Sequence, residues 1–275
     1  MTWQEAFDEV VLQRLRDDAA SIEIWQQARR GNFDPMNAVA GHGQLAERGS
    51  WRNAWWGAFR YQRYHADALL DALEDRYDAK VDRVFFDLGC GAGTVAVAID
   101  EHLRRTGSSI RMSYVGFDHN RHAISLAGKM LATPSYGHVE PVLTTTSLGE
   151  AVDGCLVLRR EGMRPFVTLS YLLRQDSVDS TAVEAFASAV AEVVADAAPH
   201  MVPLVIMDLA LPATQNLDLL CDRLSASVAI EGSRVPRTLA VPRRFPNLYP
   251  DQEGWFQVRS PRPTIHGWTL KMTAR

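Results

Sequence analysis

From residue 81 onward, the sequence alternates short apolar runs with segments of helical period. Runs rich in β-branched and aromatic residues, typical of buried strands, cover residues 81–88, 110–117, 139–144, 166–171 and 204–209. Helical patterns lie between them at residues 94–105, 121–131, 181–198 and 216–227. Strands that alternate with helices predict βαβ units, so we expect an α/β fold with a mostly parallel sheet and helices on both faces. Past Gly232, a proline-rich stretch with short runs at residues 255–258 and 268–272 predicts a closing antiparallel pair.

The first 80 residues have a different pattern, which predicts helices. Apolar residues recur every three or four positions over residues 1–30, glycine and proline mark residues 31–50 as a loop, and a second helical pattern covers residues 51–77. We therefore divide the chain into a helical N-terminal extension, residues 1–80, and a domain of residues 81–275. The second helical segment carries a dense aromatic run, formed by Trp51, Trp55, Trp56, Phe59, Tyr61 and Tyr64. Core packing is the first interpretation of this run.

Length and composition limit the classes of protein to which this chain can belong. With 275 residues, 47% of them hydrophobic and 23% charged, it suits one large domain or a domain with a cap, and it is not a disordered or low-complexity protein. No apolar run approaches the roughly 20 residues of a membrane-spanning helix, and the N-terminus lacks the pattern of a secretory signal, so we expect a cytoplasmic protein without a membrane partner. Cys90, Cys155 and Cys221 have no CxxC spacing, which argues against a disulfide framework or a structural zinc site.

The segment Asp87-Leu-Gly-Cys-Gly-Ala-Gly-Thr94 stands where the first strand pattern ends and a helix begins. Open α/β sheets bind ligands at such a junction, and glycines there let a ligand approach the backbone. The three glycines follow a G-x-G-x-G pattern rather than the G-x-G-x-x-G of dinucleotide enzymes, and Asp87 precedes them. This carboxylate would repel a pyrophosphate, whereas it would attract a ligand that carries an ammonium and a sulfonium group.

A second acid, Asp118, ends the next strand pattern, in the segment Tyr114-Val-Gly-Phe-Asp118. A carboxylate at the end of the second strand of such a sheet accepts hydrogen bonds from both hydroxyls of a ribose. The alternative is that Asp118 caps the helix that follows it. Its spacing from the glycine segment favours the ribose.

These two motifs resemble those of the class I S-adenosylmethionine-dependent methyltransferases, over roughly residues 81–211. The resemblance implies a Rossmann-like sheet of seven strands and S-adenosyl-L-methionine as the cofactor. The residues whose backbone would contact the methionine part are Gly89, Cys90, Gly91, Gly93 and Thr94. Asp87 would help to hold its ammonium group, and His119 would flank the adenosine. Residues 144–147 would line the adenine pocket, although the acid frequent there in the family is absent.

The resemblance also implies roles at the end of the fourth strand pattern and in the extension. Ser170 would form a hydrogen bond to the cofactor, and Tyr171 would line the pocket of the methyl acceptor or contact the acceptor. The alternative for Tyr171 is an aromatic residue packed in the core. In this family an N-terminal helical segment often closes over the cofactor, so the aromatic run has a second interpretation as a lid, from which Tyr61, Tyr64 and His65 would reach cofactor or substrate. A role for His65 as general base competes with a surface or helix-capping role.

The expected function is methyl transfer from S-adenosyl-L-methionine to an oxygen or nitrogen of a small molecule, with no metal and with a homodimer left open. The motif typical of enzymes that methylate base amines, Asp or Asn before Pro-Pro and an aromatic residue, is absent. Residues 230–275 contain eight basic and three acidic residues, so docking to RNA or protein is one alternative, and a solvated or internally paired face is the other. A non-catalytic module that binds the cofactor is the remaining alternative.

Overall fold

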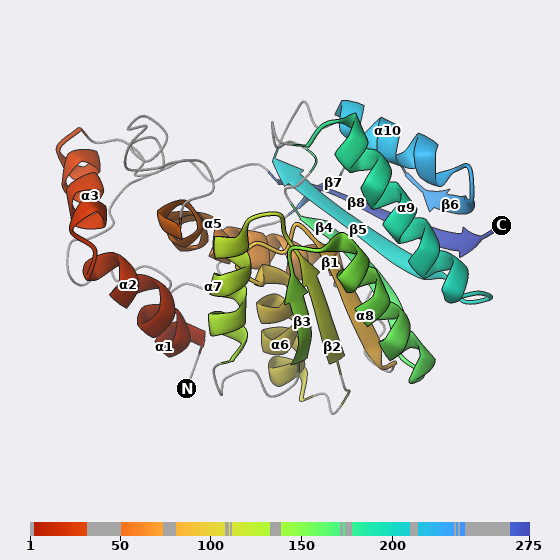
Figure 1. The fold of residues 1–275 in the computed structure, drawn as a ribbon, viewed down its shortest axis with the longest axis horizontal. Coiled ribbons are helices and arrows are strands. Elements are labelled where there is room, and N and C mark those ends of the chain that lie inside the picture. The colour runs from red at the N-terminus through yellow and green to blue at the C-terminus, as the bar shows by residue number, and fades with distance from the viewer. Residues whose placement is uncertain are drawn as a thin grey trace.

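The computed structural model describes residues 3–31, 51–73, 81–107, 110, 112–132, 139–170, 173, 178–209, 214–233, 235, 237–239 and 265–275. They form one mixed sheet with helices on both faces (Figure 1). The strands are β1 (Arg83–Leu88), β2 (Met112–Phe117), β3 (Val139–Thr145), β4 (Arg164–Ser170), β5 (Val202–Leu209), β6 (Val228–Gly232), β7 (Arg237–Leu239) and β8 (Ile265–Ala274). This arrangement confirms the expected α/β class.

The strand order is β3-β2-β1-β4-β5-β8-β6, and β7 also pairs with β8. Strands β1 to β5 run parallel, while β8 is antiparallel to β5, β6 and β7. The expected strand number of seven is therefore one too low for the described residues, because the short β7 adds an eighth. The closing antiparallel strand is present as β8, but it pairs with the unpredicted β6, and residues 255–258 lie outside the described part.

Two layers of helices cover the two faces of the sheet and bury its apolar side chains. One layer holds α5 (Trp51–Leu73), α6 (Thr94–Thr106) and α7 (Arg121–Leu131), and the other holds α8 (Leu148–Arg160), α9 (Ser180–Asp196) and α10 (Thr214–Leu224). Alternate residues of each strand point to opposite layers, so Phe85 and Phe166 lie in the first core and Phe86 and Val167 in the second. Among the described residues, no helix combines the length and apolarity needed to cross a membrane.

The N-terminal segment is broken into short helical pieces rather than one helix over residues 1–30. It consists of α1 (Trp3–Phe7), the π-helical turn η1 (Asp8–Leu12), α2 (Gln13–Arg16) and α3 (Ala19–Gly31). The break falls at Asp18, whose carboxylate accepts from the Ser21 backbone N–H at 2.8 Å and from the Arg52 guanidinium through two bonds of 2.8 Å. The Trp55 indole N–H also donates to the Val10 carbonyl oxygen, at 2.9 Å. These bonds attach the segment to α5.

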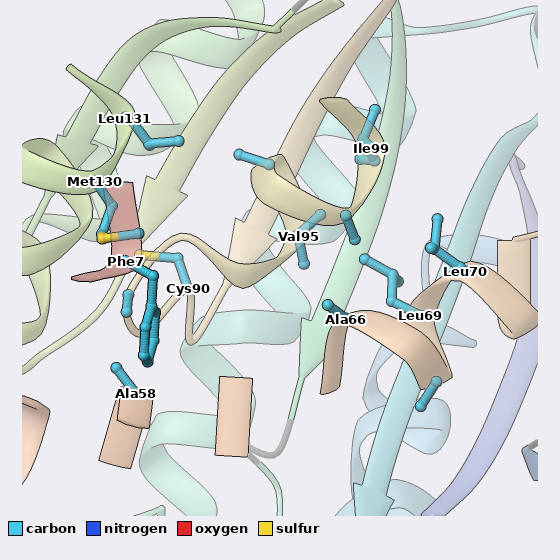
Figure 2. Close-up of a cluster of buried hydrophobic side chains, with 14 of the residues drawn as sticks. Phe7, Ala58, Ala66, Leu69, Leu70, Cys90, Val95, Ile99, Met130 and Leu131 are labelled. Carbon is cyan, nitrogen blue, oxygen red and sulfur yellow. The ribbon is translucent and has the colours of Figure 1, made fainter. Parts of the chain in front are cut away.

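The aromatic run of α5 is part of the core. Trp55, Trp56 and Phe59 are between 1% and 4% exposed. About two turns further along, Ala66 and Leu69 of α5 face Val95 and Ile99 of α6 (Figure 2). Near the aromatic run, Phe7 from α1 lies close to Ala58. The structure thus agrees with the packing interpretation for Trp55, Trp56 and Phe59, whereas the side chains of Tyr61 and Tyr64 lie outside the described part.

The close packing between β2 and the glycine segment predicts the effect of one substitution. A Cβ added at Gly116 would lie 3.0 Å from both Cys90 Sγ and Tyr114 Cε1, so Gly116→Ala should destabilise the fold by about 1–3 kcal/mol in urea unfolding. Gly128→Ala is the matched control, because a Cβ there meets nothing within 4 Å on an exposed helix position. It should stabilise the protein by about 0.5–1 kcal/mol. Equal effects of the two substitutions would contradict this account.

Candidate functional site

The turn between β1 and α6 is built from glycines in the left-handed region. Gly89, Gly91 and Gly93 have φ values of 77°, 53° and 76°, which residues with a Cβ adopt only under strain. The backbone N–H groups of Gly89 and Cys90 both donate to the Phe117 carbonyl oxygen, at 2.8 and 2.9 Å, so the turn is tied to the end of β2. A Cβ at Gly91 would meet no atom of the described residues within 4 Å. The backbone at Gly91 therefore faces open space that a ligand can enter.

Asp118 lies directly after β2 and joins this turn. Its Oδ2 accepts from the Gly91 N–H at 3.0 Å, and its Oδ1 accepts from the Asn120 N–H at 2.8 Å. The cap of α7 is Asn120, whose side chain accepts from the His122 N–H, so the interpretation of Asp118 as that cap is wrong. Each carboxylate oxygen accepts only one of these bonds and has a further lone pair, so the pair of oxygens can accept from two vicinal hydroxyls.

Burial and hydrogen bonding act in opposite directions on Asp118. Its side chain is 12% exposed, and burial raises the pKa of this carboxyl, while the hydrogen bonds from Asn120 and Gly91 lower it. The neighbouring His119 is exposed, with its Nδ1 3.7 Å from Asp118 Oδ1. The structure thus brings together the glycine turn, Asp118 and His119, as the sequence predicted.

Asp87 is placed differently from the sequence expectation. It is fully buried in the sheet, where its Oδ2 accepts from the Tyr114 hydroxyl at 2.6 Å and its Oδ1 from the Thr168 hydroxyl at 2.8 Å. Gly116 lies opposite Asp87 in the register and leaves room for the Tyr114 ring. Both carboxylate oxygens therefore face neighbouring strands, and a direct contact of Asp87 with an ammonium group stays a prediction.

Tyr114 and Thr168 were not among the site residues predicted from the sequence. A signal was available, because Thr168 is level with Asp87 in the register and Tyr114 is two residues before Gly116 on the same face of β2. Finding it requires the strand order, which a single sequence does not supply.

The carboxyl end of β4 contributes one more polar group. Thr168 and Ser170 lie on the same face of this strand, and the Ser170 Oγ is buried without a hydrogen-bond partner in the described part of the chain.

The end of β3 lies beside Asp118, because the Thr145 carbonyl oxygen accepts from the Asp118 N–H at 3.2 Å, and Ser147 caps α8. Tyr171 lies outside the described residues.

The helix α5 carries two polar residues, His65 and Gln62, and the second contacts the glycine turn. Burial lowers the pKa of His65 to about 3, so its imidazole is neutral and weakly basic at neutral pH, which argues against the general-base role. Gln62, which the sequence analysis did not single out, is 1% exposed and donates from Nε2 to the Ala92 carbonyl oxygen at 3.2 Å. This bond places α5 against the glycine turn.

Two further expectations concern metals and the basic C-terminal residues. No group of three or more histidine, cysteine or acidic side chains is arranged to hold a metal ion within the described ranges. Arg237 donates to the Asp71 carbonyl oxygen at 2.7 Å and lies 3.4 Å from its carboxylate, so this arginine is paired within the protein. The other arginines expected in a basic patch lie outside the described residues, namely Arg234, Arg243, Arg244, Arg259 and Arg262.

Comparison with known proteins gives structural likenesses alone. No protein-family model matches the chain, and no curated protein matches it. Solved structures that are similar include a SAM-dependent methyltransferase from Aquifex aeolicus (11% identity, TM-score 0.39, covering 74% of this chain and 92% of that one). A Listeria monocytogenes protein described as a class I S-adenosylmethionine-dependent methyltransferase has 12% identity and a TM-score of 0.46, covering 98% and 87%. Loganic acid methyltransferase with SAH has 10% identity and a TM-score of 0.40, covering 78% and 94%.

The buried position of Asp87 predicts how the stability of the protein depends on pH. Burial raises the pKa of Asp87 from 3.8 to about 7 in the folded protein, against the hydrogen bonds from Tyr114 and Thr168 that lower it. Between these two values the folded state holds a proton that the unfolded state has released, so this group makes the protein less stable as pH rises from about 4 to about 7. Asp87→Asn cannot titrate and should flatten that part of the profile, measured by urea unfolding from pH 4 to 8. Parallel profiles for wild type and variant would contradict it.

Proposed function

We propose that this protein is an S-adenosyl-L-methionine-dependent methyltransferase that acts on an oxygen or nitrogen nucleophile of a small molecule. The observation that carries the proposal is the bond from the Gly91 N–H to Asp118, which joins an open glycine turn to a carboxylate suited to ribose hydroxyls. Solved structures similar in fold include methyltransferases, two of them with SAH. The motif resemblance and the site geometry support the same cofactor.

The residues of the site fit the parts of this cofactor. The Asp118 carboxylate would accept from the two ribose hydroxyls, and His119 would lie beside the adenosine. The backbone from Gly89 to Gly93, with Thr94 at the start of α6, would contact the methionine part, because the turn is open at Gly91. A neutral His65 adds no positive charge near a ligand that carries an ammonium and a sulfonium group.

The chemistry requires little from the protein beyond alignment. The bound cofactor would supply a methyl group on a sulfonium. The acceptor's oxygen or nitrogen would bond to the methyl carbon as the carbon–sulfur bond breaks, the neutral thioether would leave with the electron pair, and the acceptor would release its proton to solvent. The protein would hold the acceptor in line with that bond and exclude water, and Ser170 and Tyr171 at the end of β4 are proposed to border the acceptor. Because His65 is a poor proton acceptor, an acceptor that is an amine or an acidic hydroxyl fits best.

We also propose the division into a helical cap, residues 1–80, and a cofactor-binding domain, residues 81–275. The N-terminal helical pieces of the cap are held to α5 by the Asp18 and Arg52 pair. The helix α5 is the part of residues 1–80 that packs on α6 of the cofactor-binding domain. The three cysteines are buried and free, which suits the reducing cytoplasm that we propose as the compartment.

A low-molecular-weight fraction of cell extract should take up label from methyl-labelled cofactor, and uptake by RNA or protein alone would contradict the proposed acceptor.

The ribose assignment predicts the effect of removing one carboxylate. Asp118→Ala should weaken binding of S-adenosyl-L-methionine by about tenfold or more in calorimetry, since two hydrogen bonds to a charged acceptor are lost. Urea unfolding of the variant should show that it remains folded. A folded variant with wild-type affinity would remove the assignment.

The glycine turn predicts a second effect on binding. Gly91→Val should reduce cofactor affinity by about 100-fold or more, because its side chain would fill the open space at the turn. Gly107→Val is the matched control, since Gly107 also has a positive φ, of 62°, and open space around its Cβ, at the other end of α6. Both variants should lose stability through backbone strain, but only Gly91→Val should lose binding. Equal affinities for the two variants would contradict the role of the turn.

A further inference from the structure

Gln62 is a polar residue on the buried face of α5. Its neighbours on that face one turn before and after are Ala58 and Ala66, and both alanines lie in the apolar core that Figure 2 shows. The Gln62 side chain is 1% exposed, so its amide group is buried away from solvent. A buried amide group is stable only where it finds hydrogen-bond partners.

The bond to the glycine turn fixes the orientation of the Gln62 amide. Nε2 donates to the Ala92 carbonyl oxygen at 3.2 Å, and a carbonyl oxygen can only accept, so the amide cannot be turned over. The other end of the amide, Oε1, is buried and has no hydrogen-bond partner among the described residues. An unsatisfied buried acceptor costs about 1–3 kcal/mol, which makes a missing donor the simplest explanation.

The ligand of the proposed function has such a donor. The ammonium group of its methionine part carries three N–H bonds and needs acceptors near the glycine turn. The Asp87 carboxyl is fully buried, and its two oxygens face Tyr114 of β2 and Thr168 of β4, from which they accept hydrogen bonds. Ser170 lies on the same face of β4 as Thr168, two residues nearer to the carboxyl edge, and its Oγ is also buried without a partner in the described part.

We propose that the Gln62 amide oxygen binds the ammonium group at the amino-acid end of the cofactor, with the Ser170 hydroxyl as a second acceptor in the same subsite. The inference rests on the proposed function and adds α5 to the cofactor site. Gln62 then has two roles, because Nε2 supports the turn and Oε1 contacts the ligand. It adds an acceptor to Asp87, the one that the sequence predicts there.

A purely structural role of Gln62 predicts a different result. If the residue only supports the glycine turn, its removal distorts the turn and weakens every ligand that binds there. If Oε1 contacts the ammonium, an additional loss is confined to ligands that carry an amino-acid part. Two probes separate these cases, since S-adenosylhomocysteine has the ammonium group and 5′-methylthioadenosine has the same thioether nucleoside without it.

The experiment measures both probes by calorimetry on wild type, Gln62→Met and Gln215→Met. Gln62→Met keeps the volume of the side chain and removes both the Oε1 acceptor and the Nε2 donor to Ala92, and Gln215→Met is the control on the exposed surface of α10. We expect Gln62→Met to lose affinity for both probes through the weakened turn, and to lose about tenfold or more in affinity for S-adenosylhomocysteine beyond its loss for 5′-methylthioadenosine. The control should match wild type with both.

The other outcomes overturn one proposal or the other. Equal losses for both probes, or no loss for either, overturn the role of Oε1 and leave the proposed function intact. A wild-type protein that binds neither probe overturns the proposed function itself. If Gln62→Met does not fold, Gln62→Glu is the second variant, because glutamate keeps an acceptor of the same reach. The Gln62→Glu protein should prefer S-adenosylhomocysteine over 5′-methylthioadenosine at least as strongly as wild type does. A smaller preference overturns the inference.

Discussion

The buried carboxyl group of Asp87 joins three neighbouring strands, and the geometry of the site depends on it. It accepts from Tyr114 of β2 and from Thr168 of β4, so the carboxyl ends of β2, β1 and β4 are linked by side chains as well as by the backbone ladder. The glycine turn follows β1, Asp118 follows β2, and Ser170 ends β4. A shift of any one strand would separate the groups that, under the proposed function, contact a single ligand.

Local patterns predicted the elements of the fold, while the contacts that build the site come from tertiary structure. The α/β class, the glycine turn and Asp118 followed from strand and helix periods and from one motif. The helix α8 and the strand β6 were missed, because α8 contains Gly149 and Gly154 and β6 has only five residues. Gly154 has a packing reason, since a Cβ there would lie 3.3 Å from a Leu143 methyl group of β3.

Residues whose role depends on distant partners could not be predicted from sequence alone. A glutamine in a helical pattern is an ordinary surface residue until the fold places it against Ala92, thirty positions away. In the same way, His65 was a candidate base by residue type, and only its burial makes it a weak one. The break at Asp18 also depends on a partner, Arg52, which approaches from another helix.

The burial of Asp87 changes how the site distinguishes a sulfonium nucleoside from a phosphate-bearing one. The sequence places the negative charge that would repel a phosphate on Asp87, but a carboxyl with a pKa of about 7 is only partly ionised at neutral pH. Asp118 is less buried than Asp87, and its two backbone hydrogen bonds oppose the rise in pKa that burial causes. Under the proposed function, Asp118 would contribute to the repulsion of a phosphate, while neutral acceptors such as the Gln62 amide would attract an ammonium group through hydrogen bonds. Selectivity at this site is therefore a matter of which atoms accept and which donate, as much as of net charge.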